Sequence, residues 1–173
     1  LRELRELDMN KVRFSIDFTE HEPDATGIDT VRFLMSANAG EDLKPIHKIA
    51  SGGELARIML ALKNVLAEQD HVMTMVFDEV DTGVSGDVAD RMGRTMADMS
   101  RNIQVVAITH LPQIASRGLH HYKVEKTETP EGTESHMRQL SADERVGEIA
   151  MMLSGENVTE AALENARALL STH

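Results

Sequence analysis

The sequence predicts an α/β fold in which a parallel sheet is flanked by helices and accompanied by additional antiparallel strands. Two short apolar runs, 72–77 and 103–108, each stop abruptly at polar residues, a pattern typical of strands buried inside a sheet. A segment with helical spacing, 86–99, lies between them. Strand, helix and strand in this order favour a parallel pairing of the two strands.

Length, composition and charge exclude several classes of protein. With 173 residues, 41% of them hydrophobic, the chain has the size and apolar content of one globular domain. It contains no cysteine, which excludes disulfides and thiolate metal sites and fits the reducing cytosol. No run approaches the roughly 18 consecutive apolar residues of a membrane span, so we expect no membrane partner. The net charge of −11 opposes DNA binding through the general field of this chain, and an aromatic content of 3% provides few groups for base stacking.

The amino-terminal segment is expected to contain the end of a helix and two strands. The chain begins at Leu1 rather than Met, and leucines recur every three residues, so we interpret residues 1–10 as the end of a helix that enters from a longer protein. Residues 11–18 and 30–37 alternate apolar and polar side chains and therefore predict strands, with a polar segment around Pro23 turning the chain between them.

Helical spacing and turn residues assign the rest of the chain. In one predicted helix the apolar stripe is mostly methionine, which we interpret as core packing rather than as a functional methionine surface. Ser141 and Glu144 form a capping box at the start of another, and Gly155 ends it. The predictions are a helix over 52–68 with Leu55, Ile58, Met59, Leu62 and Leu66 on its apolar face, a helix over 86–99 with Val88, Met92, Met96 and Met99, a short helix from Pro112, a hairpin of strands 120–126 and 134–140 around residues 129–132, a helix over 141–153 and a helix over 159–170.

The first motif with a candidate function is Ser51-Gly52-Gly53-Glu54, at the start of the first long helix. A capping box explains Ser51 and Glu54, because the serine accepts a hydrogen bond from a helix N–H and the glutamate reaches back. It does not explain two glycines in the first turn, each of which costs about 0.5–1 kcal/mol relative to alanine. Glycines allow another chain or a phosphate to approach the backbone, and a helix amino terminus attracts anions. A cap and an anion site therefore both remain open.

The second motif is Asp78-Glu79, at the end of the first apolar run. Charged groups at this place must be solvated or paired, and open α/β sheets bind ligands beyond the carboxyl ends of their strands. Because neighbouring side chains of a strand point to opposite sides, we expect one carboxylate to hold Mg²⁺ through its water shell and the other to orient or deprotonate a water. A solvated strand end is the simpler alternative, and Asp81 extends the pair to a candidate metal cluster.

The third motif is Thr109-His110, at the end of the second apolar run. A histidine by itself is more often a capping or packing residue than a catalyst, and the chain has 8 of them. We do not expect zinc, since cysteine and an HExxH pair are absent and the adjacent His120 and His121 point to opposite faces of a strand. His110 becomes a candidate because it ends a strand of the same type as the one before the acidic pair. If the two strands are neighbours, the three side chains border one site.

The three motifs, in this order and spacing, resemble the heads of ABC-type ATPases and, within that superfamily, the SMC-like proteins of bacterial DNA repair. The resemblance covers nearly the whole chain, and the combination of motifs is specific. It is carried by 49–57 (IASGGELAR), 77–86 (FDEVDTGVSG) and 109–115 (THLPQIA), and also by 36–40 (SANAG), by His121 and Tyr122, and by the helices up to Leu170.

The resemblance implies a role for each motif residue. In this family two heads sandwich ATP with Mg²⁺, and each head contacts the γ-phosphate of the ATP that the other head holds. Ser85 stands where many members carry aspartate, so it is alternatively a cap of the helix that begins at Gly86. The implied roles are the signature motif for Ser51, Gly52, Gly53 and Glu54, Mg²⁺ support for Asp78, polarisation of the attacking water for Glu79, a switch histidine near the γ-phosphate for His110, and a D-loop at the dimer seam for Thr82, Gly83 and Ser85.

The chain lacks the glycine-rich phosphate loop G-x-x-x-x-G-K-[ST]. In the proteins it resembles, that loop lies in the amino-terminal part, before a long coiled coil. The resemblance therefore implies that residues 1–10 end the returning coiled coil and that residues 11–173 form the carboxyl-terminal lobe of a split head. The implied partners are the amino-terminal half of the same protein, a second head, DNA as broken ends or single strands, and the recombinase machinery, in the cytoplasm at the nucleoid.

The resulting hypothesis is an ATP-hydrolysing, DNA-associated factor of double-strand break repair, of which this chain alone is inactive. Two alternatives come from other classes. A metal-dependent nuclease or phosphoesterase would use Asp78, Glu79 and Asp81, but it leaves the paired glycines and Thr109-His110 unexplained. A dimerisation head without catalysis would keep the fold, but the presence of Glu79 argues against it.

Overall fold

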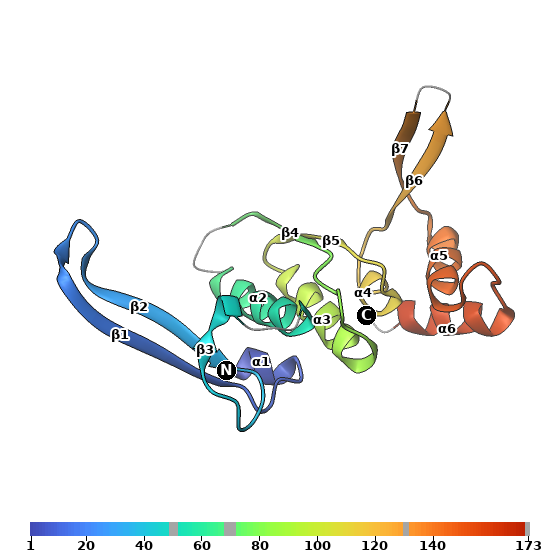
Figure 1. Cartoon of the computed structure of the whole chain (residues 1–173). Helices are drawn as coiled ribbons and strands as arrows, with labels where there is room; N and C mark the ends of the chain where they lie inside the picture. Colours follow the sequence, from blue (N-terminus) through green and yellow to red (C-terminus); the bar gives the residue numbers. More distant parts are fainter. Residues whose placement is uncertain (49–51, 68–71, 130–131, 172–173) are drawn as a thin grey trace.

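Two parallel strands form the centre of the structure, and helices and antiparallel hairpins surround them (Figure 1). The computed structural model describes residues 1–173 apart from 49–51, 68–71, 130–131 and 172–173. In chain order the elements are α1 (Arg2–Glu6), β1 (Arg13–Asp24), β2 (Gly27–Ser36), β3 (Lys44–Pro45), the 3₁₀ helix η1 (Ile46–Lys48), α2 (Gly52–Leu66), β4 (Thr74–Asp78), α3 (Gly86–Met99), β5 (Gln104–Ile108), α4 (Pro112–Ala115), β6 (Tyr122–Thr129), β7 (Gly132–Gln139), α5 (Ala142–Ser154) and α6 (Glu160–Leu170).

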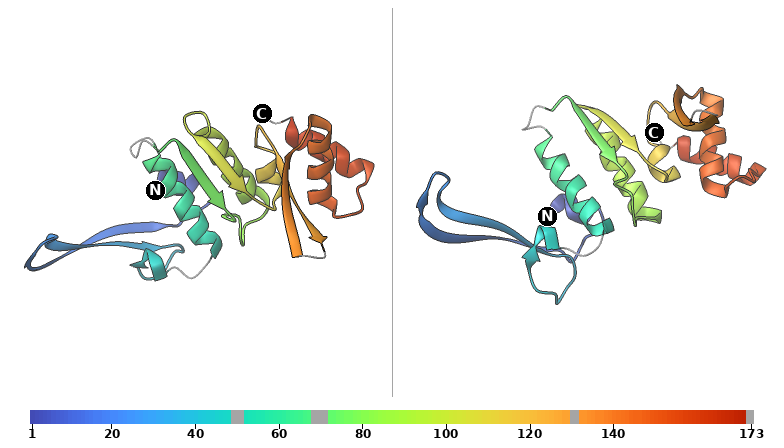
Figure 2. Two further views of the ribbon diagram at one scale, coloured as in Figure 1. Left: turned by 90° about the horizontal axis from the view of Figure 1, so that it is seen from above. Right: turned by 45° about the horizontal axis from the view of Figure 1, so that its top comes forward.

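The parallel pair consists of β4 and β5, whose register places Asp78 opposite Ile108 at their carboxyl ends. Helix α3 connects the two strands, as the order of elements predicts. Helices α2 and α3 lie on one side of the pair (Figure 2). The antiparallel strands are also present, since β1 pairs with β2 and β6 with β7. The predicted α/β class with additional antiparallel strands is confirmed.

Two clusters of buried side chains hold the elements together. The larger contains Leu4 of α1 and Leu7 directly after it, together with Met92, Met96 and Met99 of α3. These methionines are at most 5% exposed, so the interpretation of the methionine stripe as core is confirmed. The smaller cluster joins α5 to α6 through Ile149, Ala150, Ala162 and Ala166.

One face of the parallel pair is uncovered among the described residues, which contradicts the expectation that both strands are buried inside a sheet. Phe77 is buried, but the alternate residue Val76 is 60% exposed, and its neighbours Val106 and Ile108 of β5 are 42% and 53% exposed. Apolar runs of this kind indicate strands with two covered faces, whereas the described part of this chain supplies helices to one face. We call these three residues, Val76, Val106 and Ile108, the open sheet face.

Helix α2 buries a different face from the one predicted. Ile58 of the predicted stripe is buried, but three other members of the stripe are between 38% and 45% exposed. The helix is apolar on two sides and packs with one of them against α1 and α3, where it buries Leu60 and Ala61. The exposed members of the predicted stripe are Leu55, Met59 and Leu62.

The β1–β2 hairpin is long and extends away from the helices (Figure 1). Both strands run further than predicted, and the chain turns between Asp24 and Gly27, within the polar segment expected to form the turn. The cross-strand register places apolar residues of both strands on one face, and two of their aromatic rings stack with centroids 5.9 Å apart. The apolar hairpin face consists of Phe14, Ile16, Phe18, Val31 and Phe33, each at least 39% exposed.

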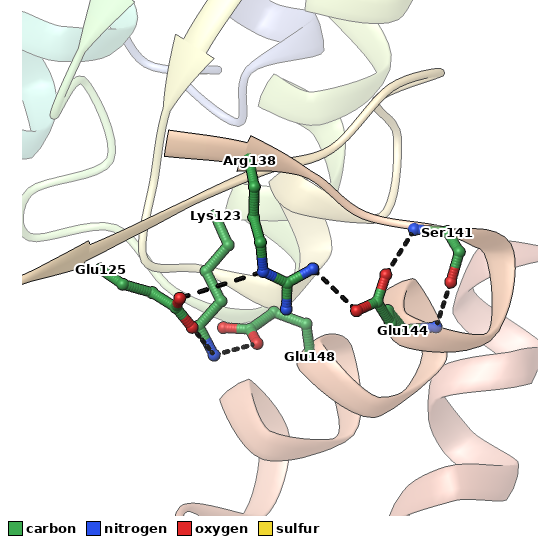
Figure 3. A network of polar contacts seen from close by, with 6 residues as sticks. All are labelled: Lys123, Glu125, Arg138, Ser141, Glu144 and Glu148. Carbon is green, nitrogen blue, oxygen red and sulfur yellow. Dashed lines mark hydrogen bonds and ion pairs between the residues drawn. The ribbon is translucent and has the colours of Figure 1, made fainter. Parts of the chain in front are cut away.

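The β6–β7 hairpin is anchored to α5 by ion pairs (Figure 3). Lys123 Nζ lies 2.6 Å from Glu148 Oε2, and Arg138 Nη1 lies 2.7 Å from Glu144 Oε1. Glu144 also forms the predicted capping box, since Oε2 accepts from Ser141 N at 2.8 Å and Glu144 N donates to Ser141 Oγ at 3.3 Å. The network therefore joins a strand pair to the first turn of a helix.

The end of α5 and the start of α6 also have capping residues. Gly155, with a φ of 73°, ends α5, and Thr159 Oγ1 accepts from Ala162 N at 3.2 Å at the start of α6. Thr129 and Gly132 close the β6–β7 hairpin, while residues 130 and 131 of the predicted turn lie outside the described residues. Among the described residues, no helix has both the length and the apolar character needed to cross a membrane.

Candidate functional site

The candidate site lies at the carboxyl ends of β4 and β5. Asp78 is the last residue of β4, and Thr109 and His110 directly follow β5, so the second and third motifs meet at one edge of the sheet as predicted. Asp78 occupies the same side of the sheet as the open sheet face, because it alternates with Val76 and pairs with Ile108. Its side chain is exposed, as are those of Glu79 and His110.

Glu79 has a backbone conformation that few residues other than glycine adopt. Its φ is 49°, while its N–H still donates to Ile108 O at 3.2 Å and so continues the pairing with β5. Thr82 Oγ1 donates to the carbonyl of Glu79 at 3.0 Å. A left-handed conformation in a residue with a side chain costs about 1–3 kcal/mol and is concentrated at functional sites. Both carboxylates stay at the surface, Asp78 as the last residue of β4 and Glu79 in the turn that follows.

Asp81 points into the protein instead of toward Asp78 and Glu79. It is 1% exposed, and its Oδ2 accepts hydrogen bonds from Thr109 Oγ1 and, at 3.3 Å, from the N–H of His110. The same oxygen lies 3.5 Å from His110 Nδ1, while the His110 side chain is 68% exposed. The buried carboxylate thus joins the loop after β4 to the end of β5.

The metal cluster considered for Asp78, Glu79 and Asp81 is wrong. Within the part of the chain that the structure describes, no three His, Asp or Glu side chains are grouped so that they could hold a metal ion together. The physical reason is the turn after β4, which directs Asp81 inward while Asp78 and Glu79 remain at the surface. This geometry removes the support for a nuclease or phosphoesterase built on the three carboxylates.

Close packing explains one of the two glycines at the start of α2. A Cβ on Gly53 would lie 2.8 Å from the carbonyl oxygen of Gly83, which is nearer than real Cβ contacts, so only glycine fits there. Gly83 itself has a φ of 74°. A Cβ on Gly52 would meet nothing within 4 Å, so this position leaves the backbone open to approach from outside. Gly53 of the first motif and the loop containing Thr82 and Gly83 therefore lie side by side.

The sequence predicts capping residues at the starts of α2 and α3. Ser51, the expected cap of α2, lies outside the described residues, and Glu54 lies in the first turn of α2. Ser85 occupies the cap position of α3, but its side chain makes no capping hydrogen bond. The interpretation of Ser85 as a side-chain cap is therefore wrong, because its extended backbone places the residue correctly while its hydroxyl does not bond to the helix.

Two residues near the site have contacts that sequence reasoning missed. Arg57 Nε donates to the carbonyl of Gly53 and its Nη1 donates to the carbonyl of Leu7, both at 3.2 Å, so it ties the start of α2 to the first helix. The four-residue spacing from Gly53 could have indicated the first contact but not the second. The Thr109 hydroxyl binds the Asp81 carboxylate, and no local pattern relates two residues 28 positions apart.

Comparison with known proteins finds relatives that share one name. The chain is 43% identical over 169 residues to the DNA repair protein RecN of Rickettsia conorii, covering 98% of this chain and 31% of that protein. It is 47% identical to RecN of Deinococcus radiodurans, covering 97% of this chain and 29% of that protein. The chain thus spans about a third of the length of these relatives and corresponds to their carboxyl-terminal part. No protein-family model matches the chain.

Solved structures with a similar fold are heads of SMC proteins. The Smc head domain with a coiled coil and joint from Pyrococcus yayanosii matches with a TM-score of 0.65 and 20% identity, covering 90% of this chain and 28% of that chain. An SMC ATPase studied for ATP-driven dimerization and DNA-stimulated activation matches with a TM-score of 0.58 and 18% identity, covering 90% of this chain and 92% of that one. The predicted SMC-type head is confirmed as the fold.

Proposed function

Since the chain corresponds over nearly its whole length to the carboxyl-terminal part of the DNA repair protein RecN, we propose that it forms that half of an ATP-hydrolysing, SMC-like head. The observation that carries the proposal is the meeting of three exposed side chains at one sheet edge. Asp78 ends one strand with Glu79 directly after it, and His110 follows its parallel neighbour. In sheets of this kind, ligands bind beyond the carboxyl ends of the strands.

Asp78, Glu79 and His110 are the residues of the site that take part in ATP hydrolysis. Asp78 fits Mg²⁺, because that ion keeps several waters and takes one or two carboxylates together with the phosphates of its substrate. When bound, the ion neutralises phosphate charge. Glu79 orients the attacking water from its turned backbone position, and His110 directs its exposed imidazole to the γ-phosphate.

The first motif acts on ATP held by a second head. Gly52, Gly53 and Glu54 form the first turn of a helix of 15 residues whose amino terminus favours an anion, and Gly52 leaves room for a phosphate to approach. Gly53 packs against Gly83, so the D-loop residues Thr82, Gly83 and Ser85 belong to the same surface. Two copies of the head therefore enclose two ATP molecules at a shared seam.

The amino-terminal half of the same protein is the partner that completes this head. It supplies the phosphate loop, which is absent from the 173 residues. Parallel sheets occur with both faces covered, yet the open sheet face and the apolar hairpin face are uncovered among the described residues. Both are apolar surfaces of the kind that a second half of the same domain buries.

DNA is engaged by the larger protein rather than by the general field of this chain. The net charge of −11 repels a phosphate backbone, so the DNA contacts lie mainly elsewhere in the full-length molecule. ATP hydrolysis opens the pair of heads and thereby couples turnover to DNA engagement. Without the phosphate loop, this chain alone does not turn over ATP.

The test is Glu79→Gln in the full-length protein. The substitution keeps the size of the side chain and removes the charge that orients water, so we expect ATP hydrolysis to fall by about 100-fold or more and ATP-bound dimers to accumulate. Sedimentation in the presence of ATP and Mg²⁺ measures the dimer, and phosphate release measures hydrolysis. Glu156→Gln, at an exposed loop position between α5 and α6, is the matched control and should behave like the unmodified protein. Normal turnover by the Glu79 variant would contradict the proposal.

A further inference from the structure

Asp81 is a buried carboxylate to which the proposed function gives no role. Carboxylates are almost never this deeply buried unless they are paired, and Asp81 is 1% exposed. One of its oxygens, Oδ1, is buried and has no hydrogen-bond partner among the described residues. Burying a charged carboxylate costs stability when only one of its two oxygens is hydrogen-bonded. A purely structural role is therefore a poor explanation for an acidic residue here.

Among the described residues, the polar contacts of the Asp81 side chain all lie on Oδ2 and lead to the third motif. The hydroxyl of Thr109 and the N–H of His110 both donate to this oxygen, and the N–H of Leu111 donates to the Thr109 hydroxyl at 3.0 Å. The backbone of residues 109–111 is therefore held around one carboxylate oxygen. His110 Nδ1 lies 3.5 Å from the same oxygen, so the imidazole turns this nitrogen toward the protein.

The hydrogen bond that one ring nitrogen of a histidine makes decides the state of the other. With Nδ1 directed to a carboxylate, the exposed side of the ring presents Nε2. On the proposed function, Nε2 is then the atom that faces the γ-phosphate. Because Asp81 belongs to the loop that contains Thr82 and Gly83, the orientation of the ring is tied to the position of that loop.

We propose that Asp81 is the positioning residue of His110 and couples the D-loop to it. This inference rests on the proposed function, since it assigns a partner to a histidine of that same site. When the D-loop is seated against Gly53, Asp81 holds the backbone of 109–111 and directs Nε2 outward. A displaced D-loop withdraws the carboxylate and leaves the ring without orientation. Closure of the dimer seam thereby controls whether the histidine is in place.

The experiment is a double-mutant cycle on ATP hydrolysis by the full-length protein. Asp81→Asn keeps the shape of the side chain and removes its charge, and we expect kcat to fall between about tenfold and 100-fold, with KM for ATP changed by less than about twofold. In a His110→Gln background the same substitution should lower kcat no further, because its effect passes through the imidazole. Where steady-state turnover is below detection, single-turnover hydrolysis of labelled ATP supplies the rate.

A pair of variants at Thr109 provides an independent test and replaces Asp81→Asn if that variant does not fold. Thr109→Val removes the hydroxyl that binds Asp81 and should lower kcat in the same way, whereas Thr109→Ser keeps the hydroxyl and should retain activity. An unchanged kcat in Asp81→Asn, or an equal loss with and without His110, would overturn the inference. Full activity of His110→Gln itself would instead overturn the role of His110 in the proposed function.

Discussion

The two hairpins of this chain are built alike but are stabilised in opposite ways. In the β6–β7 hairpin, Lys123 and Arg138 lie on one face and form ion pairs with α5 of the same chain (Figure 3). In the β1–β2 hairpin, the apolar hairpin face carries three of the four phenylalanines of the chain, and no described element covers it. The β6–β7 hairpin is tied to α5 on this face and exposes Tyr122, Val124 and Met137 on its other face, whereas no described element covers the apolar hairpin face of β1–β2.

On the proposed function, the difference indicates where the amino-terminal half binds. Charged residues on a strand discourage further pairing, whereas a contiguous exposed apolar face marks an interface. The open sheet face, next to Asp78, has the same character as the apolar hairpin face. The proposed amino-terminal half is therefore expected on the side of β1–β2 and β4–β5, not on the side of the network around Glu144.

The largest effect is expected for Phe33→Ala, on the apolar hairpin face. If this face binds the amino-terminal half, loss of a central aromatic side chain should weaken the complex of the two halves by about 2–4 kcal/mol, as for a well-packed interface residue. The stability of this chain alone should change by less than about 1 kcal/mol, because Phe33 is 52% exposed. Calorimetric titration of the separately produced halves measures the first quantity, and urea unfolding measures the second.

Arg32→Ala is the matched control for that comparison. Arg32 is the preceding residue of β2 and therefore points to the polar face of the hairpin, opposite Asp17 on the partner strand. Its removal should leave the affinity of the two halves within about 0.5 kcal/mol. Equal losses for Arg32→Ala and Phe33→Ala would show that the apolar hairpin face is not the interface.

The order and type of the main elements could be predicted from the sequence, because their signals are local. Apolar alternation, helical spacing, the Ser141–Glu144 box and Gly155 each act within a few residues, and the structure confirms them. The burial of the strands could not be predicted in the same way. Apolar runs such as 72–77 indicate what a strand needs to bury, whereas the covering segments lie elsewhere in the sequence or outside this chain.

In the candidate site, too, some features could be predicted from the sequence and others could not. Asp78 and His110 could be assigned to one edge because parallel strands end at the same side of a sheet. The inward direction of Asp81 could not be inferred, since the turn after a strand has no period that fixes the direction of its side chains. Its contact with Thr109 also joins residues 28 positions apart, a distance at which a single sequence carries no signal.

A smaller effect is expected for Lys123→Ala, which breaks the β6–β7 network. Lys123 and Glu148 are each about a quarter exposed and their charged atoms are 2.6 Å apart, so the pair is better placed than most surface pairs. Its loss should destabilise the chain by about 1 kcal/mol, and the loss should shrink as salt is added. Lys126→Ala, at an exposed position of the same strand, is the control for urea unfolding. An equal effect of the two substitutions would mean that the network does not anchor the hairpin.

The smallest effects on stability are expected at two carboxylates, Glu144 beside the β6–β7 hairpin and Asp24 in the β1–β2 turn. Hydrogen bonds from the Ser141 backbone and hydroxyl, together with Arg138, lower the pKa of Glu144. Hydrogen bonds from the Thr26 hydroxyl and N–H lower the pKa of Asp24 in the β1–β2 turn. A carboxyl group with a lower pKa in the folded state contributes stability above its unfolded pKa, and this contribution is lost as the pH falls through the folded pKa.

Glu144→Gln and Asp24→Asn should therefore each destabilise the chain at neutral pH and approach the unmodified protein as the pH falls below about 4. The two sites should differ in their response to salt. Added salt weakens the part of the Glu144 effect that comes from Arg138, whereas the hydrogen bonds around Asp24 come from neutral donors and are less affected, apart from a 4.0 Å contact with His21 Nδ1 that is charged only when the imidazole is protonated. Urea unfolding at two pH values and two salt concentrations measures both responses. If salt reduced the Asp24 effect as much as the Glu144 effect, the distinction between a hairpin held by charge and one held by its own turn would be lost.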